Sequence, residues 1–175
     1  MSWELIKTET QGSNASTLTC NFDDVAFADV AFFVIVMNGK AGDDGSGSNF
    51  RIGPNSGVSV YAGYDMESFV MSGGSSPVID YTDAVNQTRF PFMAMSENDS
   101  YTSAIIYLGL DFARGGSSTE GKPLCFWKVG TQETLVEGSG WLDVNLTNFG
   151  EVKWEAEVGD IDADSYISVY KVASS

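Results

Sequence analysis

The fold is decided by the stretch IDADSYISVYKV at residues 161–172, read together with the stretch WELIKTET at residues 3–10. Both show the period-2 alternation of β-strands, and a small polar turn over residues 12–16 leads from the second stretch into another strand, TLTCNF, at residues 17–22. A chain that opens and closes on such strands is typical of a sandwich or barrel in which both end strands are held in sheets. We therefore predict an all-β, antiparallel β-sandwich of the jelly-roll type, formed by a single domain over residues 1–175.

Further strands are predicted between these ends, where short apolar or alternating runs stand between clusters of Gly, Pro, Asn and Ser. No window repeats apolar residues at helical spacing, and only one helical turn is predicted, over residues 80–86. Fewer than about a tenth of the residues should therefore be helical. The further strands are predicted at residues 30–37, 49–52, 57–62, 68–71, 78–81, 90–95, 103–112, 124–129, 140–144, 152–158 and 165–172.

The predicted strands differ in how many faces are apolar. Residues 152–158, VKWEAEV, alternate between apolar and charged side chains, which indicates one buried face and one solvated face. Residues 31–37 and 104–108 are apolar on both faces, which predicts central strands whose second face is covered by loops or by another subunit.

The charge of the chain restricts its partners. It has 24 acidic and 9 basic residues, a net charge of −15 and a pI near 4.1. Nucleic-acid binders present clustered Lys and Arg, so we expect no nucleic acid and no anionic membrane as a partner. The longest apolar run has eight residues, 30–37, whereas a transmembrane helix needs about 20. The acidity favours solubility, and it also allows docking onto a basic or cation-rich surface.

The absence of histidine excludes several kinds of reaction centre. With no His in the chain, Ser-His-Asp and Cys-His nucleophilic catalysis and His-containing zinc sites are excluded. Paired carboxylates, as in a glycoside hydrolase, are the remaining enzymatic possibility. Because an acidic surface produces many chance carboxylate pairs, we predict no enzyme, no catalytic residues and no cofactor.

Cysteine and acidic residues offer no clear metal site. Cys20 and Cys125 are too far apart for a ligand motif, and they are expected to be buried and reduced unless their strands are neighbours. The alternate aspartates of residues 160–164 begin like a calcium loop, but Ser165 stands where an EF-hand needs Gly. A weaker calcium site shared with Asp43 and Asp44 stays open beside the simpler reading, a solvated acidic turn, and no metal is predicted. The glycine-rich residues 39–47 lack the Gly-Lys-Ser/Thr ending of a phosphate loop.

Aromatic residues gather in the middle third of the chain. Tyr and Trp on loops can anchor an interface or stack on sugar rings, although most are ordinary strand and core residues. Together with the strands that are apolar on both faces, they leave more apolar surface than one core can hide, which favours homo-oligomers or ordering at a multi-subunit surface. The residues predicted to form this interface are Tyr61, Tyr64, Phe69, Phe90 and Phe92.

Three regions, residues 3–22, 49–64 and 161–172, resemble a family of small phage virion proteins with a jelly-roll-type β-sandwich. The resemblance rests on the opening WELI, the turn and strand SNASTLTCNF, the apolar strand DVAFFV at residues 29–34, the loop NFRIGPNSG at residues 49–57 and the alternating C-terminal strand. The chain departs from the family pattern at residues 170–172, where YKV replaces a Tyr-Gly-Ile ending.

The resemblance implies a non-enzymatic, multi-copy role on the outside of a phage particle, on its head or its tail. The expected function is a capsid decoration (cement) protein that binds the major capsid protein or other virion proteins. A carbohydrate-binding or receptor-binding module of a tail appendage is the alternative. No secretion signal is recognised, so we expect synthesis in the host cytoplasm and residence in the virion.

Overall fold

The computed structural model describes residues 2–40, 48–55, 64–72, 78–87, 90–92, 101–111, 122–130, 134–142 and 146–173. For residues 64–72, 78–87 and 90–92, and for 111, 122, 134 and 142, it describes the backbone alone. Within these ranges the chain is almost wholly extended, and the only helical element is a three-residue 3-10 turn, Phe27–Asp29. The strands are β1 (Trp3–Thr10), β2 (Thr17–Ala26), β3 (Val30–Gly39), β4 (Ser48–Gly53), β5 (Tyr64–Ser72), β6 (Val78–Gln87), β7 (Phe90–Phe92), β8 (Thr102–Asp111), β9 (Lys122–Gly130), β10 (Thr134–Leu142), β11 (Asn148–Ala156) and β12 (Tyr166–Ala173).

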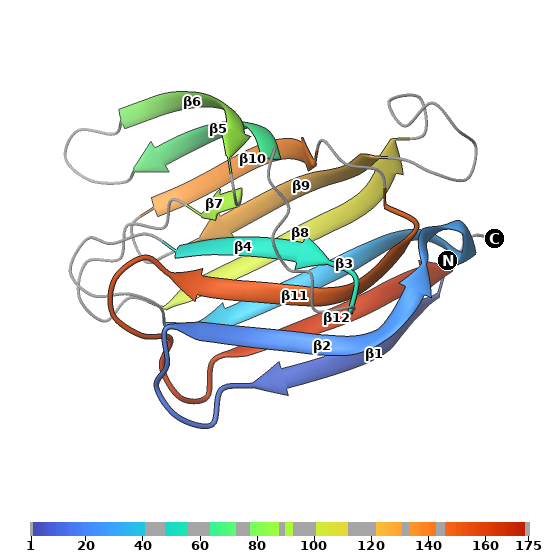
Figure 1. The fold of residues 1–175 in the computed structure, drawn as a ribbon. Helices are drawn as coiled ribbons and strands as arrows, with labels where there is room; N and C mark the ends of the chain where they lie inside the picture. Colours follow the sequence, from blue (N-terminus) through green and yellow to red (C-terminus); the bar gives the residue numbers. More distant parts are fainter. Residues whose placement is uncertain are drawn as a thin grey trace.

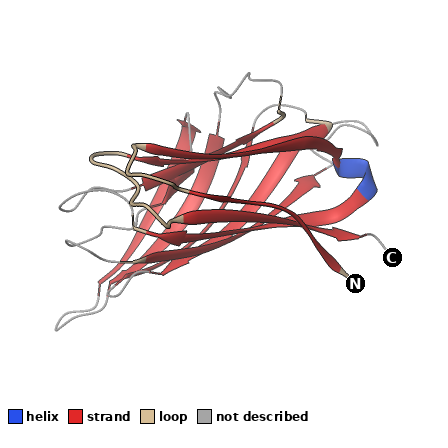
Figure 2. Ribbon diagram, turned by 90° about the horizontal axis from the view of Figure 1, so that it is seen from below, coloured by secondary structure: helices blue, strands red, loops and turns tan. Residues whose placement is uncertain are grey.

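The strands form two antiparallel sheets packed face to face. The larger sheet has eight strands in the order β1-β12-β3-β8-β9-β10-β5-β6, and the smaller has four in the order β2-β11-β4-β7. Figures 1 and 2 show the smaller sheet lying over one face of the larger one. The prediction of an all-β antiparallel sandwich is therefore confirmed.

The sheet order is that of a jelly roll with an extension. The strands β1, β12, β3 and β8 face β2, β11, β4 and β7, so that consecutive strands alternate between the two sheets as in a double Greek key. The remaining strands, β5, β6, β9 and β10, all continue the larger sheet beyond β8 (Figure 1). Only one of the two sheets is thus broadened.

Two elements differ from those predicted from the sequence. The helical turn predicted over residues 80–86 is wrong, because these residues pair with β5 as part of β6. The strand predicted at residues 140–144 begins earlier, at Thr134, since β10 pairs with both β9 and β5 from there on. The prediction at residues 57–62 lies outside the described residues. The two strands predicted to be central, β3 and β8, are indeed neighbours inside the larger sheet.

Aromatic rings join the two sheets at the middle of the core. Phe149 of β11 lies edge-on to Phe33 of β3, with ring centroids 4.8 Å apart, and to Phe22 of β2, at 5.1 Å. Phe27 of the 3-10 turn meets Phe33 at 5.3 Å. All four rings are buried, so this cluster fixes the spacing of the sheets.

A second contact joins the sheets toward the extension. Trp127 of β9 packs edge-on against Phe50 of β4, with centroids 5.9 Å apart. Its ring lies over Gly138 of β10, where a Cβ atom would approach the ring to 2.4 Å. The missing side chain of Gly138 is therefore what makes room for the indole.

The two cysteines are separate, buried thiols. Cys20 lies in the smaller sheet and Cys125 in the larger, both are free, and both are fully buried in the core. Burial raises the pKa of the Cys20 thiol from 9.0 to about 11, with nearby Lys7 acting in the opposite direction. Burial also raises the pKa of Cys125.

Both thiols should resist alkylation in the folded protein, because the thiolate is the reactive form and neither sulfur is accessible. At pH 8 we expect iodoacetamide to add no group to the native chain and two groups to the chain in urea, counted by intact-mass spectrometry. Between pH 9 and about 11 the unfolded chain loses the Cys20 proton first, so the stabilising contribution of this thiol should decline across that window. Rapid labelling of the native protein at pH 8 would contradict this placement of the cysteines.

Candidate interaction surface

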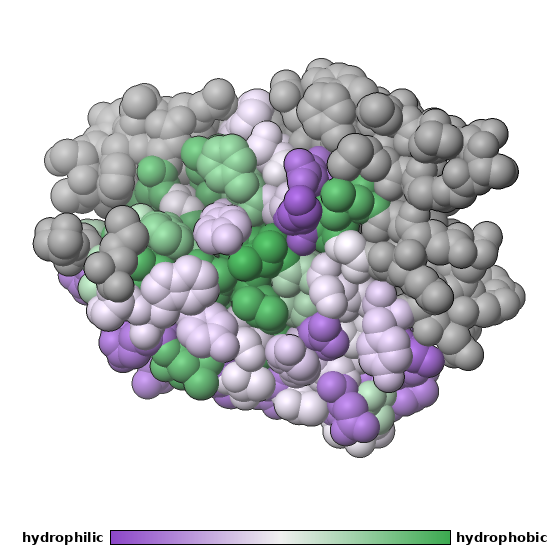
Figure 3. Space-filling model, turned by 180° about the vertical axis from the view of Figure 1, so that it is seen from behind, coloured by the Kyte–Doolittle hydropathy of each residue, from purple (hydrophilic) through white to green (hydrophobic). Residues whose placement is uncertain are grey.

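The outer face of the larger sheet is built from strands that are apolar on both sides. Along β3, Phe33, Ile35 and Met37 belong to the core. The alternate residues Phe32 and Val36 lie on the opposite face, away from the smaller sheet, and are partly exposed. Figure 3 views the molecule from this side and shows hydrophobic residues gathered over its middle.

The outer face has a packed layer of its own. Trp3 of β1 lies 6.1 Å from Tyr170 of β12, and Phe32 lies 6.2 Å from Tyr107 of β8, measured between ring centroids. Val34 stands in register between Tyr170 and Tyr107 and is fully buried although it lies outside the core cluster. The aromatic rings thus cover small side chains and are themselves left at the surface.

Large apolar side chains remain exposed on this face. Trp3 is 54% exposed, Leu5 52%, Tyr107 40% and Phe126 of β9 53%. Monomeric proteins rarely expose contiguous apolar patches beyond a few hundred Å², and larger ones usually mark interaction sites. Partly exposed apolar residues continue the face over Phe32, Val36, Ile105, Leu124, Leu135, Trp141 and Tyr170. We call the outward side of β1, β12, β3, β8, β9 and β10, which carries these residues, the outer face.

The described side chains of the outer face carry almost no charge in a strongly acidic chain. Among the described outward-facing side chains of β12, β3, β8, β9 and β10, the charged ones are Lys128 and Glu137, which pair at 2.5 Å. The smaller sheet differs, because its exposed surface carries Asp23, Lys153 and the Arg51–Glu155 ion pair at 2.9 Å. Over the described side chains, the larger sheet therefore presents an apolar and nearly neutral surface, and the smaller sheet presents a charged one.

The residues predicted for the interface are divided between the sheets. Tyr64 and Phe69 lie in β5 of the larger sheet, Phe69 in register with Glu137. Phe90 and Phe92 lie in β7 of the smaller sheet. Tyr61 lies outside the described residues, as do the side chains of the other four. The backbone thus places Tyr64 and Phe69 in one sheet and Phe90 and Phe92 in the other, and the prediction of a shared interface stays a prediction.

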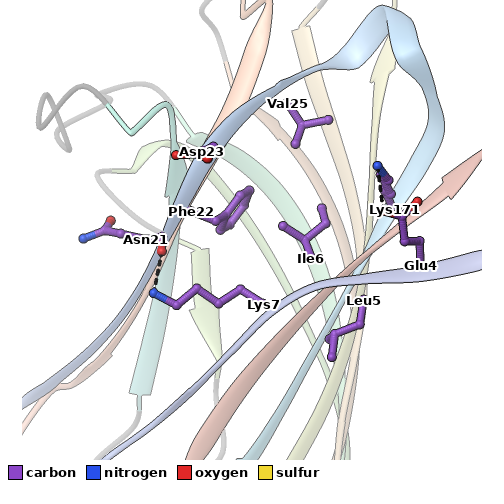
Figure 4. Close-up of a pocket in the computed structure, with 9 residues that line it drawn as sticks. All are labelled: Glu4, Leu5, Ile6, Lys7, Asn21, Phe22, Asp23, Val25 and Lys171. Atoms are coloured by element: carbon purple, nitrogen blue, oxygen red, sulfur yellow. Dashed lines mark hydrogen bonds and ion pairs between the residues drawn. The ribbon is translucent and has the colours of Figure 1, made fainter.

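A cleft opens at the edge of the sandwich, between β1 and β2 (Figure 4). It has a volume of about 470 Å³, and Ile6, Phe22 and Val25 form its apolar part. The pairing of β1 shifts between Leu5 and Lys7, so a bulge at Ile6 widens the opening.

The two lysines around the cleft are already paired. Lys7 donates to the backbone oxygen of Asn21 at 2.8 Å and lies 3.1 Å from a carboxylate oxygen of Glu9. Lys171 lies 3.0 Å from a carboxylate oxygen of Glu4. These pairs place charge along an edge strand, which discourages the addition of a further strand.

The acidic turn over residues 160–164 has a structural role. The amide of Asp162 donates to the carbonyl oxygen of Lys40 at 3.0 Å, and the amide of Asp164 donates to that of Gln11 at 2.9 Å. The side-chain oxygen of Asn14 accepts from the amide of Ala163 at 3.0 Å. The turn therefore ties the start of β12 to the β1–β2 connection and to the end of β3.

Within the described part of the chain, no group of three or more Cys, Asp or Glu side chains could hold a metal ion. Asp43 and Asp44, the other candidate calcium ligands, lie outside it. No helix in the same residues is long and apolar enough to cross a membrane.

Comparison of the chain with protein-family models, with curated proteins and with solved structures found no match. The surfaces and side chains described above are therefore the basis for a functional conclusion.

Proposed function

We propose that this protein is a non-enzymatic structural component of a phage particle, acting as a decoration protein on the outer surface of the major capsid protein lattice. The observation that carries the proposal is the outer face, a broad apolar surface on the larger sheet. Such a surface is typical of a protein that works within a multi-subunit assembly. The resemblance to small phage virion proteins supports the choice of a phage particle as the assembly.

The distribution of charge suits a protein held on a larger scaffold. Among the described side chains, acidic groups lie on the exposed surface of the smaller sheet and along β1, and the outward side of β12, β3, β8, β9 and β10 carries one ion pair. An acidic surface is attracted to basic patches of a scaffold, and electrostatic steering accelerates such docking. Docking through this surface leaves the apolar face free for a different contact.

The proposal predicts that the protein is a multi-copy component of the particle encoded by the same genome. Mass spectrometry of purified particles should find it, and gold-labelled antibodies should mark the head. Its affinity for particles that lack it should fall roughly tenfold or more between about 0.1 M and 1 M salt, because the Debye length falls from about 10 Å to about 3 Å. An affinity that does not change with salt concentration would contradict the electrostatic docking. Absence of the protein from purified particles would contradict the whole proposal.

A carbohydrate-binding module is the second candidate, and one observation favours it. Trp3, Tyr107 and Phe126 are exposed on a sheet face, where aromatic rings can stack on sugar rings. A glycan array separates the candidates, because a decoration protein should bind no sugar. A tail location in the particle together with sugar binding would favour this second candidate.

A further inference from the structure

We propose that the outer face is an isologous interface that binds a second copy of this chain. The resulting dimer packs two larger sheets against each other through Trp3, Leu5, Tyr107 and Phe126. The inference does not depend on the phage assignment, because it concerns the chain alone.

The first argument is charge. Two copies carrying −15 each repel one another over most of their surfaces. Among the described surfaces, this repulsion is smallest over the outward side of β12, β3, β8, β9 and β10, since the described charges there are Lys128 and Glu137, which neutralise each other. A basic partner, by contrast, would be drawn to the acidic surfaces elsewhere and would find no excess charge here.

The second argument is self-complementarity. In an isologous interface the same patch is used twice, so a patch of one charge sign would oppose itself. The outer face satisfies this condition, because its described charges, Lys128 and Glu137, are one of each sign. Both side chains are about half exposed, at 55% and 49%, so neither sign dominates the surface that the second copy meets.

The third argument is area. The six strands β1, β12, β3, β8, β9 and β10 span roughly 24 Å at a spacing of about 4.8 Å, and eight residues along a strand cover roughly 26 Å. The face therefore offers roughly 600 Å², close to the ~800 Å² per partner of a stable interface. Sheets pack face to face in this way in ordinary sandwiches, with strand directions about 30° apart.

The test is the mass of the full chain in solution, measured by sedimentation velocity over a range of concentrations. We expect a dimer at micromolar concentration and at least a hundredfold weaker association for Phe126→Lys. This substitution reduces the net negative charge of the chain, so a loss of association cannot be attributed to greater long-range repulsion between the two acidic copies. The matched control is Val158→Lys, which changes an apolar side chain that is 61% exposed and lies off the outer face, and it should associate like the unmodified chain.

Salt dependence and particle binding separate this inference from the proposed function. Association should tighten as salt increases, because screening weakens the repulsion between two acidic copies, opposite to the salt effect expected for particle docking. A strictly monomeric chain, or equal association of Phe126→Lys and the unmodified chain, overturns the inference. A monomer that is found on particles overturns only the inference, and a dimer that is absent from particles overturns only the proposed function. Thermal unfolding of both variants identifies any loss caused by misfolding.

Discussion

Replacing Phe149 with alanine should lower the free energy of unfolding by about 3–5 kcal/mol, the usual effect of removing a buried aromatic ring. The ring of Phe149 is fully buried and contacts both Phe33 of the larger sheet and Phe22 of the smaller one. Its loss would leave a cavity between the sheets that neither sheet can fill alone. Because domains of this size are stable by about 5–15 kcal/mol, the change should be large in a urea or thermal unfolding curve.

The matched control for this prediction is Phe126→Ala. The same side chain is removed, but Phe126 is 53% exposed on the outer face. At a protein concentration where the chain is monomeric, we expect a loss below about 1 kcal/mol, in the range of substitutions at exposed sites. Equal losses for the two variants would mean that the Phe149 cluster does not hold the sheets together.

Replacing Gly138 with alanine should cost about 1–3 kcal/mol through overpacking. A Cβ atom at this position would approach the Trp127 ring to 2.4 Å. The indole cannot move freely because Phe50 of the opposite sheet packs on it at 5.9 Å. The lower midpoint should be accompanied by a change in near-ultraviolet circular dichroism, as the tryptophan environment shifts.

Gly109→Ala should not lower the stability of the protein, although Gly109 occupies a similar backbone site. Gly109 also lies in a strand of the larger sheet, but an added Cβ would meet nothing within 4 Å. Since glycine inside a strand costs about 0.5–1 kcal/mol relative to alanine, this variant should be equal to or slightly more stable than the unmodified protein. A Gly138→Ala variant as stable as Gly109→Ala would contradict the packing of Trp127 on Gly138.

Alternation along the chain predicted most strands because each strand has to satisfy two different environments. The clearest case is β11, where Val152 and Trp154 are buried while Lys153 and Glu155 are partly exposed. The helical turn predicted over residues 80–86 is wrong because polar residues there interrupt the alternation that would indicate strand β6. Pairing with β5, a long-range effect, decides its structure instead of local preference.

The candidate interaction surface was only partly predictable. The sequence indicates that β3 and β8 are apolar on both faces, and hence that one face needs a cover. It does not indicate which residues face the smaller sheet, because that depends on the position of β4 and β11 in space. Trp3 and Phe126 therefore do not stand out in the sequence, whereas the aromatics of the middle third do because of their density along the chain.

The position of β12 between β1 and β3 has a consequence for the order of events during synthesis. A ribosome makes β1 and β3 more than a hundred residues before β12, and neither strand can complete its pairing in the meantime. Until β12 is made, the partly folded chain exposes two open strand edges and the apolar residues of β3. Such a state is prone to aggregation. The many acidic residues give that waiting chain a strong mutual repulsion, which keeps nascent molecules apart until the final strand closes the sheet.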